Sequence, residues 1–199
     1  MCGWLWTTTM FDVADILCPR DTQNLNRIPR MQAIYDALWK VADRHCPATV
    51  FEIGVRAGYS AYTWIVGGGS VCEYTGCDVD DRKRYGGPWL DWAEKLLRDL
   101  YESHGVQWEL LLRDSQQMTL LPGTFDLIHV DGDHTYEGCM HDMELCWPAV
   151  NPGGVMVVDD ATYLPGPVRA VHDFSAKVKD AERIYLEQSP TGSMVYVKA

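Results

Sequence analysis

The fold of this chain is decided by residues 49–60, which read TVFEIGVRAGYS. Residues 49–53 have the composition of a short buried strand, and they lead directly into a turn that contains Gly54 and Gly58. The segment after the turn, residues 60–66, has the composition of a helix. Glycine lets the backbone of such a turn approach a bound molecule, and the helix that follows offers free amide groups. The stretch therefore predicts a strand, a ligand-binding turn and a helix.

Strands and helices alternate through the rest of the chain. Further strands are predicted at 73–77, 108–112, 125–130, 155–158, 183–186 and 194–197, and further helices from Ile28 to before Pro47, at 89–101 and at 136–147. The short apolar strands 127–130 and 155–158 are typical of a parallel sheet that is covered on both faces. Ser189-Pro190-Thr191-Gly192 predicts a hairpin before the last strand. We therefore predict an α/β fold with a mostly parallel seven-stranded sheet, an antiparallel C-terminal hairpin strand and helices on both faces.

Length and composition limit the classes of protein that the chain can be. Its 199 residues suit one domain, and we predict an N-terminal arm over residues 1–27, which lack periodicity, and a domain over 28–199. The formal net charge of −11 argues against a nucleic-acid partner, because phosphate binding needs a basic surface. No apolar run approaches the roughly 20 residues that span a membrane.

The cysteines and the first residues indicate a cytoplasmic protein. The seven cysteines are an odd number and contain no C-x-x-C pair, which favours reduced thiols over a disulfide or zinc framework. No basic residue precedes Arg20, so the start of the sequence does not have the pattern of a secretory signal.

Polar side chains follow the predicted strands at their carboxyl ends, where ligands bind in open α/β sheets. They are Asp78 after the second strand, Asp114, Ser115 and Gln116 after the third, Asp131 and His134 after the fourth, and Asp159 and Asp160 after the fifth. Asp78 lies 26 residues after Glu52, which suits a carboxylate that accepts from both hydroxyls of a ribose. The alternatives are a helix N-cap for Asp78 and simple tight packing for Gly54 and Gly58.

Three of these carboxylates predict a cation site. Asp131, Asp159 and Asp160 end neighbouring strands, and they would repel one another unless a cation or a proton lay between them. Ligation by oxygen alone favours a hard divalent ion such as Mg²⁺. His129, inside the predicted fourth strand, is expected in the core rather than at the site.

The motifs together resemble a known family. EIGVRAGYS, the acid after the second strand, DSQ after the third, VDGDHTYEG and NPGGVMVVDD are similar to class I S-adenosylmethionine-dependent methyltransferases. The nearest group is the small metal-dependent O-methyltransferases, which include catechol O-methyltransferase and the macrocin-type sugar O-methyltransferases. The resemblance covers roughly residues 28–199, and it implies a Rossmann-like methyltransferase fold.

The resemblance also implies roles for individual residues. Contacts with S-adenosylmethionine would fall to Glu52, Gly54, Gly58, Ser60, Asp78, Asp114, Ser115 and Gln116. Mg²⁺ or another divalent cation would be held by Asp131, Asp159 and Asp160. His134, three residues after the first metal acid, would be the general base, with a supporting or capping histidine as the alternative. Arg56 replaces the middle glycine of the more general G-x-G-x-G pattern, and Asp133 and Asp160 stand where the catechol enzymes carry Trp and Asn. These departures favour an acceptor other than a catechol.

We therefore expect methyl transfer to a hydroxyl group of a small molecule, which could be a sugar, a diol or a phenol. The alternative is a nucleotide or dinucleotide binder, either a dehydrogenase or a non-catalytic protein. A dehydrogenase would need the motif G-x-G-x-x-G, and its reaction does not require the metal-binding carboxylates. Several aromatic side chains could line the acceptor site or belong to the core: Trp4, Trp6, Tyr85, Trp89 and Tyr163. Assembly into a homo-oligomer is left open.

Overall fold

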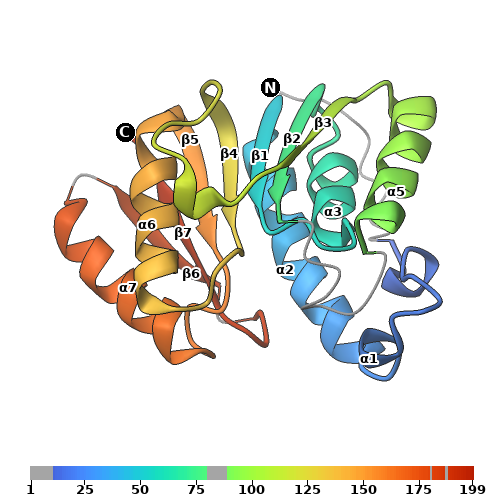
Figure 1. Ribbon diagram of the computed structural model, residues 1–199, viewed down its shortest axis with the longest axis horizontal. Coiled ribbons are helices and arrows are strands. Elements are labelled where there is room, and N and C mark those ends of the chain that lie inside the picture. The colour runs from blue at the N-terminus through green and yellow to red at the C-terminus, as the bar shows by residue number, and fades with distance from the viewer. Residues whose placement is uncertain (1–10, 80–88, 180, 187) are drawn as a thin grey trace.

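A computed structural model describes residues 11–79, 89–179, 181–186 and 188–199. One seven-stranded sheet runs through it in the order β3-β2-β1-β4-β5-β7-β6 (Figure 1). The strands are β1 Thr49–Ile53, β2 Glu73–Asp78, β3 Gln107–Leu112, β4 Phe125–Val130, β5 Val150–Val158, β6 Glu182–Leu186 and β7 Ser193–Val197. Neighbouring strands are parallel except at β7, which is antiparallel to β5 and to β6. The predicted fold class is confirmed.

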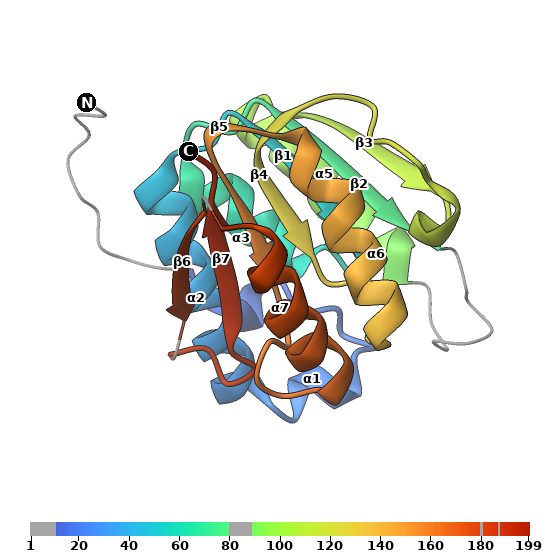
Figure 2. The ribbon, with the colours of Figure 1, turned by 90° about the vertical axis from the view of Figure 1, so that its left-hand side faces the viewer.

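Helices cover both faces of the sheet, as Figure 2 shows. The first face carries α2 Ile28–His45, α3 Tyr59–Gly68 and α5 Trp89–His104, and the second carries α6 Tyr136–Cys146 and α7 Pro165–Lys177. Shorter elements are α1 Thr22–Leu25 and the 3₁₀ turns η1 Val13–Asp15, η2 Ser115–Gln117 and η3 Trp147–Ala149.

The period of two along the strands divides the apolar side chains between two cores. In β1, Val50 belongs to the cluster that contains Leu38 of α2 and Trp64 of α3. Its neighbour Phe51 belongs to the cluster on the opposite face, with Met143 of α6. All five side chains are buried. The sheet is therefore apolar on both faces, which is why its central strands read as nearly continuous apolar runs.

Two of the longer elements differ from the prediction. β5 begins at Val150 rather than at Val155, because Val150 already pairs with Phe125 before an irregularity in the register. The intervening Asn-Pro-Gly-Gly has the composition of a turn, which hid the start of the strand. The helix α7 was not predicted, since its first turn begins Pro-Gly-Pro; proline is tolerated there because the first amides of a helix have no partner within it.

Residues 11–27, called the N-terminal segment below, pack against the domain. Val13, Ile16, Leu17 and Cys18 are buried in the same core as α2 and α3. The helix α2 begins at Ile28, where the domain was predicted to begin; the division into arm and domain stays a prediction. Within the described part of the chain, every helix is too short or too polar to cross a bilayer.

The chain order of the strands reverses between β1 and β4. From β1 the chain proceeds outward to β2 and β3, and it then returns to build β4 and β5 on the other side of β1. Such a reversal opens a crevice at the carboxyl ends of the two strands. Here Gly54 follows β1 and Asp131 follows β4, and a side chain at Gly54 would lie 2.0 Å from the carbonyl oxygen of Asp131. Only glycine fits at this approach.

Candidate active site

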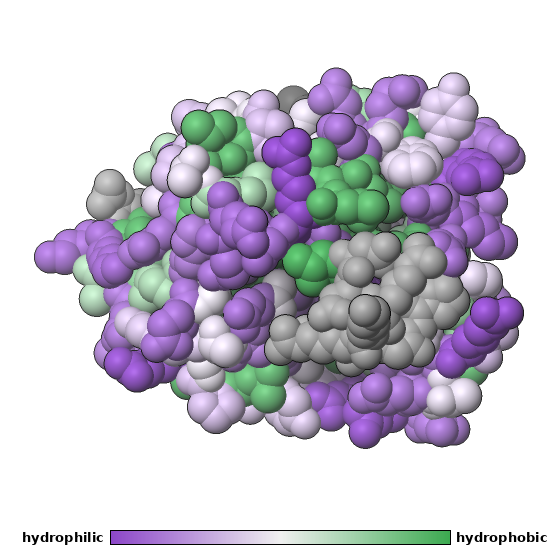
Figure 3. Space-filling model, in the orientation of Figure 1, coloured by the Kyte–Doolittle hydropathy of each residue, from purple (hydrophilic) through white to green (hydrophobic). Residues whose placement is uncertain are grey.

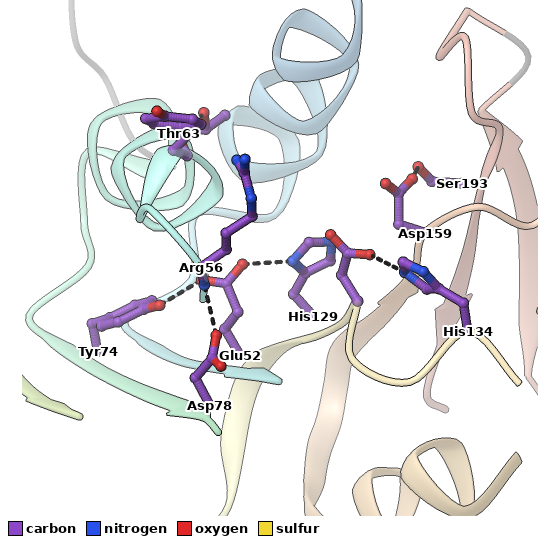
Figure 4. A network of polar contacts seen from close by, with 11 residues as sticks. Glu52, Arg56, Thr63, Tyr74, Asp78, His129, His134, Asp159 and Ser193 are labelled. Atoms are coloured by element: carbon purple, nitrogen blue, oxygen red, sulfur yellow. Dashed lines mark hydrogen bonds and ion pairs between the residues drawn. The ribbon is translucent and has the colours of Figure 1, made fainter. Parts of the chain in front are cut away.

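The turn between β1 and α3 is held in an unusual backbone conformation. Gly54, Arg56 and Gly58 have φ angles of +93°, +47° and +76°. The left-handed region costs a residue with a side chain about 1–2 kcal/mol, so Arg56 needs compensating contacts. One comes from Asp78 at the end of β2, whose Oδ2 accepts from the Arg56 amide at 2.7 Å (Figure 4). Burial raises the pKa of Asp78, although this amide works to lower it.

Glu52, predicted to contact the cofactor, lies in the interior. Its carboxylate accepts a hydrogen bond from the Tyr74 hydroxyl, and its Oε1 lies 2.7 Å from Nδ1 of His129. All three side chains are at most 1% exposed, which confirms His129 as a core residue. Burial alone would lower the pKa of His129, but Glu52 raises it above its ordinary value. Glu52 thus ties β1 to β2 and β4, and its contact with a cofactor stays a prediction.

The residues after β3 are anchored to α6. Asp114 caps the turn η2, where its Oδ1 accepts from the Gln116 amide at 3.0 Å, and Ser115 is buried. The Gln116 side chain donates to Oδ1 of Asp142 at 2.8 Å.

Ser60, another residue predicted to contact the cofactor, is buried in the first turn of α3, beside the glycine turn.

Three side chains that could share a metal ion meet at the carboxyl edge of the sheet. Asp131 follows β4, His134 precedes α6, and Asp160 follows β5 with a φ of +54°. Nε2 of His134 lies 3.2 Å from Oδ1 of Asp131 and 3.5 Å from Oδ2 of Asp160, and one ligand atom from each side chain lies within 4.8 Å of the others. Ligand atoms about 2.1 Å from a shared octahedral ion are about 3 Å apart, so this donor set fits a divalent cation.

Asp159, the third acid of the predicted metal set, lies outside this group of three. Its Oδ1 accepts from the hydroxyls of Thr191 at 3.0 Å and Ser193 at 2.8 Å. The hairpin that leads into β7 therefore holds Asp159 beside the site. Figure 4 shows Asp159 and Ser193 close to each other, with His134 nearby.

The electrostatics of the cluster also favour a cation. Burial, followed by repulsion from Asp159 and Asp131, raises the pKa of Asp160 to about 7. Burial and Asp159 likewise raise the pKa of Asp131. The hydrogen bond with Asp131 raises the pKa of His134 to about 9. Negative charge is thus crowded here, and a bound cation would relieve this repulsion.

The aromatic residues that were predicted near the acceptor divide into two groups. Trp4, Trp6 and Tyr85 lie outside the described residues. Trp89 and Tyr163 each lie under a guanidinium group, that of Arg56 and that of Arg30, with the guanidinium carbon 4.7 Å from the ring centroid in both cases. Tyr163 is 56% exposed, so it belongs to the surface near Asp160 rather than to the core.

Two buried acids were missed by the sequence reasoning. Asp21 is 1% exposed and pairs with Arg56, and Asp142 is fully buried beneath Gln116. No local pattern could reveal the first, because its partner lies 35 residues further along the chain. The burial of Asp142 could have been predicted, because this residue lies on a helix between Met140 and Met143, whose positions face the core.

A sequence comparison identifies the family. The family described as "Methyltransferase domain" matches residues 51–161, which is more than half of the chain. The chain therefore belongs to this methyltransferase family, and the resemblance inferred from the motifs is confirmed. The match does not favour the dinucleotide-binding alternative. Among curated proteins, no sequence matches the chain.

Solved structures of O-methyltransferases share the fold. A putative caffeoyl-CoA O-methyltransferase from Staphylococcus aureus is 13% identical, with 90% of this chain and 92% of that chain covered and a TM-score of 0.64. CalS11, a TDP-rhamnose 3′-O-methyltransferase of calicheamicin biosynthesis, is 18% identical, with 92% and 91% covered and a TM-score of 0.63. An O-methyltransferase from Bacillus cereus in complex with SAH is 17% identical, with 94% and 95% covered and a TM-score of 0.54.

Proposed function

We propose that the protein transfers the methyl group of S-adenosylmethionine to a hydroxyl group of a small molecule, and that a divalent cation assists the reaction. The observation that carries the proposal is the meeting of Asp131, His134 and Asp160 at the carboxyl edge of the sheet, next to the glycine turn. Family membership supports methyl transfer, and the cluster supports oxygen as the acceptor atom, because a hydroxyl must lose its proton to become a good nucleophile.

The residues around the turn fit S-adenosylmethionine. Gly54 and Gly58 carry no side chains, so the backbone of the turn can approach a bound molecule at these two positions, and α3 begins directly after the turn. Asp78 presents a carboxylate that the Arg56 amide holds in place and that can accept from ribose hydroxyls. Ser115 and Gln116 lie on the side where the base of the nucleoside would extend. These residues would bind and orient the cofactor, which supplies the methyl group.

The cluster supplies a site for the cation and for proton transfer. Asp131 and Asp160 would hold the cation, with Asp159 and His134 beside them. A divalent ion in this place stabilises negative charge on an acceptor oxygen and lowers the pKa of a neighbouring imidazole. His134 is 47% exposed, so its ring is accessible. We assign it the role of general base, with Nε2 as the atom that takes the proton, and not that of a metal ligand, because one nitrogen cannot hold the cation and take the proton at the same time.

The acceptor that we propose is polar and small. The described residues around the cluster include the Asp159 carboxylate and the Arg30–Tyr163 pair, which suit a hydroxylated molecule such as a sugar or a diol better than an apolar one. Outside the grey atoms, the face of the molecule in Figure 3 is largely hydrophilic, with separate apolar patches. Neither a nucleic acid nor a membrane is part of the proposal. We also propose a cytoplasmic location, in keeping with the odd number of cysteines and the lack of a C-x-x-C pair.

The direct test is methyl transfer from labelled S-adenosylmethionine to a panel of sugars, diols and catechols, followed by mass spectrometry. The protein is first stripped with a chelator and then supplied with Mg²⁺ or Mn²⁺. We expect transfer only after a cation is added. Transfer that persists after exhaustive chelation would contradict the role of the metal, and a protein that neither binds the cofactor nor transfers the label would contradict the whole proposal.

A further inference from the structure

Both the backbone and the side chain of Arg56 are held by hydrogen bonds. Its amide donates to Asp78, and its guanidinium NH1 donates to Oδ2 of Asp21, 2.8 Å away in the N-terminal segment. The guanidinium also lies over the ring of Trp89 at the start of α5. The only side-chain-bearing residue with a positive φ in the turn is thus fixed by three elements, β2, the N-terminal segment and α5, all of which lie outside the β1–α3 unit.

The carboxylate of Asp21, which binds this arginine, is buried and accepts several hydrogen bonds. Its side chain is 1% exposed, yet its oxygens accept from the Asn24 amide at 3.3 Å, the Asn24 side chain at 2.9 Å and the Tyr59 hydroxyl at 3.1 Å, besides Arg56. Burial would raise the pKa of Asp21, but Arg56 and the other donors lower it below its ordinary value. A buried carboxylate that keeps its charge depends on its donors, of which Arg56 is the only cation among those described, so loss of the arginine would leave a buried charge without its counter-ion.

Two further bonds place the N-terminal segment across the turn. The Cys18 amide donates to the hydroxyl of Tyr59, the first residue of α3, at 2.9 Å. The indole of Trp92 in α5 donates to the carbonyl of Ile16 at 2.9 Å. The segment therefore bridges the two helices that flank the turn.

We infer that Asp21 is a positioning residue for the cofactor site: through Arg56 it holds the turn between β1 and α3 in its binding conformation, and it couples docking of the N-terminal segment to occupancy of that site. The inference rests on the proposed binding of S-adenosylmethionine. The coupling passes through one residue, because the Arg56 backbone contacts the ribose acid Asp78 while its side chain contacts Asp21.

Coupling of this kind is reciprocal. If the docked segment strengthens cofactor binding, then the bound cofactor must strengthen docking of the segment by the same factor. Amide hydrogen exchange in residues 13–25 must therefore slow when the site is filled. If Asp21 had only a structural role, its replacement would lower the stability of the protein, but filling the cofactor site would not slow hydrogen exchange in the segment.

The experiment uses the full chain and S-adenosylhomocysteine as the probe. Calorimetry measures its affinity, and hydrogen exchange is followed in residues 13–25 with and without it. The variants are Asp21→Asn, Arg56→Gly and the double variant, because asparagine keeps the shape of the acid and glycine tolerates the turn conformation. Asp15→Asn, an exposed acid in the same segment, is the matched control.

We expect each of the two single variants to weaken binding by about 5- to 150-fold, the usual range for coupled sites, and to abolish the slowing of exchange. The double variant should bind no more weakly than Arg56→Gly, and the control should bind like the wild type. Wild-type affinity and protection in Asp21→Asn, even with a lower melting temperature, would overturn the inference. A wild-type protein that does not bind the probe would instead overturn the proposed function on which the inference rests.

Discussion

Asp142 offers a test of the electrostatics around the site. The side chain is fully buried between η2 and α6, and burial raises its pKa from the ordinary 3.8 to about 6. Because each pKa unit corresponds to about 1.4 kcal/mol, the ionised form costs the folded protein about 3 kcal/mol at neutral pH. The folded state binds more protons than the unfolded state between pH 3.8 and about 6, so this contribution lowers stability as the pH rises through that window and levels off above it.

The variant Asp142→Asn removes the titration and keeps the shape of the side chain. Urea unfolding of both proteins gives the free energy of unfolding at each pH, and the difference between them cancels every other titrating group. The free energy of unfolding of the Asp142→Asn variant should rise relative to that of the wild type by about 1.3 kcal/mol between pH 5 and pH 7. Any constant offset, such as an unsatisfied amide hydrogen in the variant, does not affect this change with pH.

The control is Asp43→Asn, which neutralises an exposed acid on α2. Its difference from the wild type should stay within about 0.5 kcal/mol at all pH values. If the Asp142→Asn difference is also constant from pH 5 to pH 7, then Asp142 does not titrate in this range and the reasoning from its burial is refuted.

Two further predictions concern the site itself. Asp78→Ala should weaken S-adenosylhomocysteine binding by about 10- to 150-fold, since a charged acceptor for the ribose is lost; calorimetry that shows unchanged affinity would remove Asp78 from the site. His134→Gln should lower kcat by about 100- to 10,000-fold with little change in cofactor affinity. The wild-type kcat should rise with pH as the imidazole loses its proton, and the variant should lack this rise; two superimposable pH–rate profiles would assign the base elsewhere.

The sequence by itself determined the order and type of most elements. The apolar period of α2 and the short apolar runs of β4 and β5 are local signals, and a parallel α/β arrangement follows from their alternation. The edge at which the site would lie was also readable, because parallel strands place their carboxyl ends together. The acids at 131 and 160 could therefore be predicted to approach each other from their positions alone.

Only the tertiary structure decided which atom each polar group contacts. The resemblance implied a cofactor contact for Glu52 and a metal contact for Asp159. Glu52 instead bonds Tyr74 and His129 in the core, and Asp159 accepts from Thr191 in the hairpin and from Ser193 at the start of β7. The pairing of Asp21 with Arg56 joins segments 35 residues apart. A hydrogen bond depends on distances of a few tenths of an ångström between groups from separate elements, and those distances exist only once the helices have packed on the sheet.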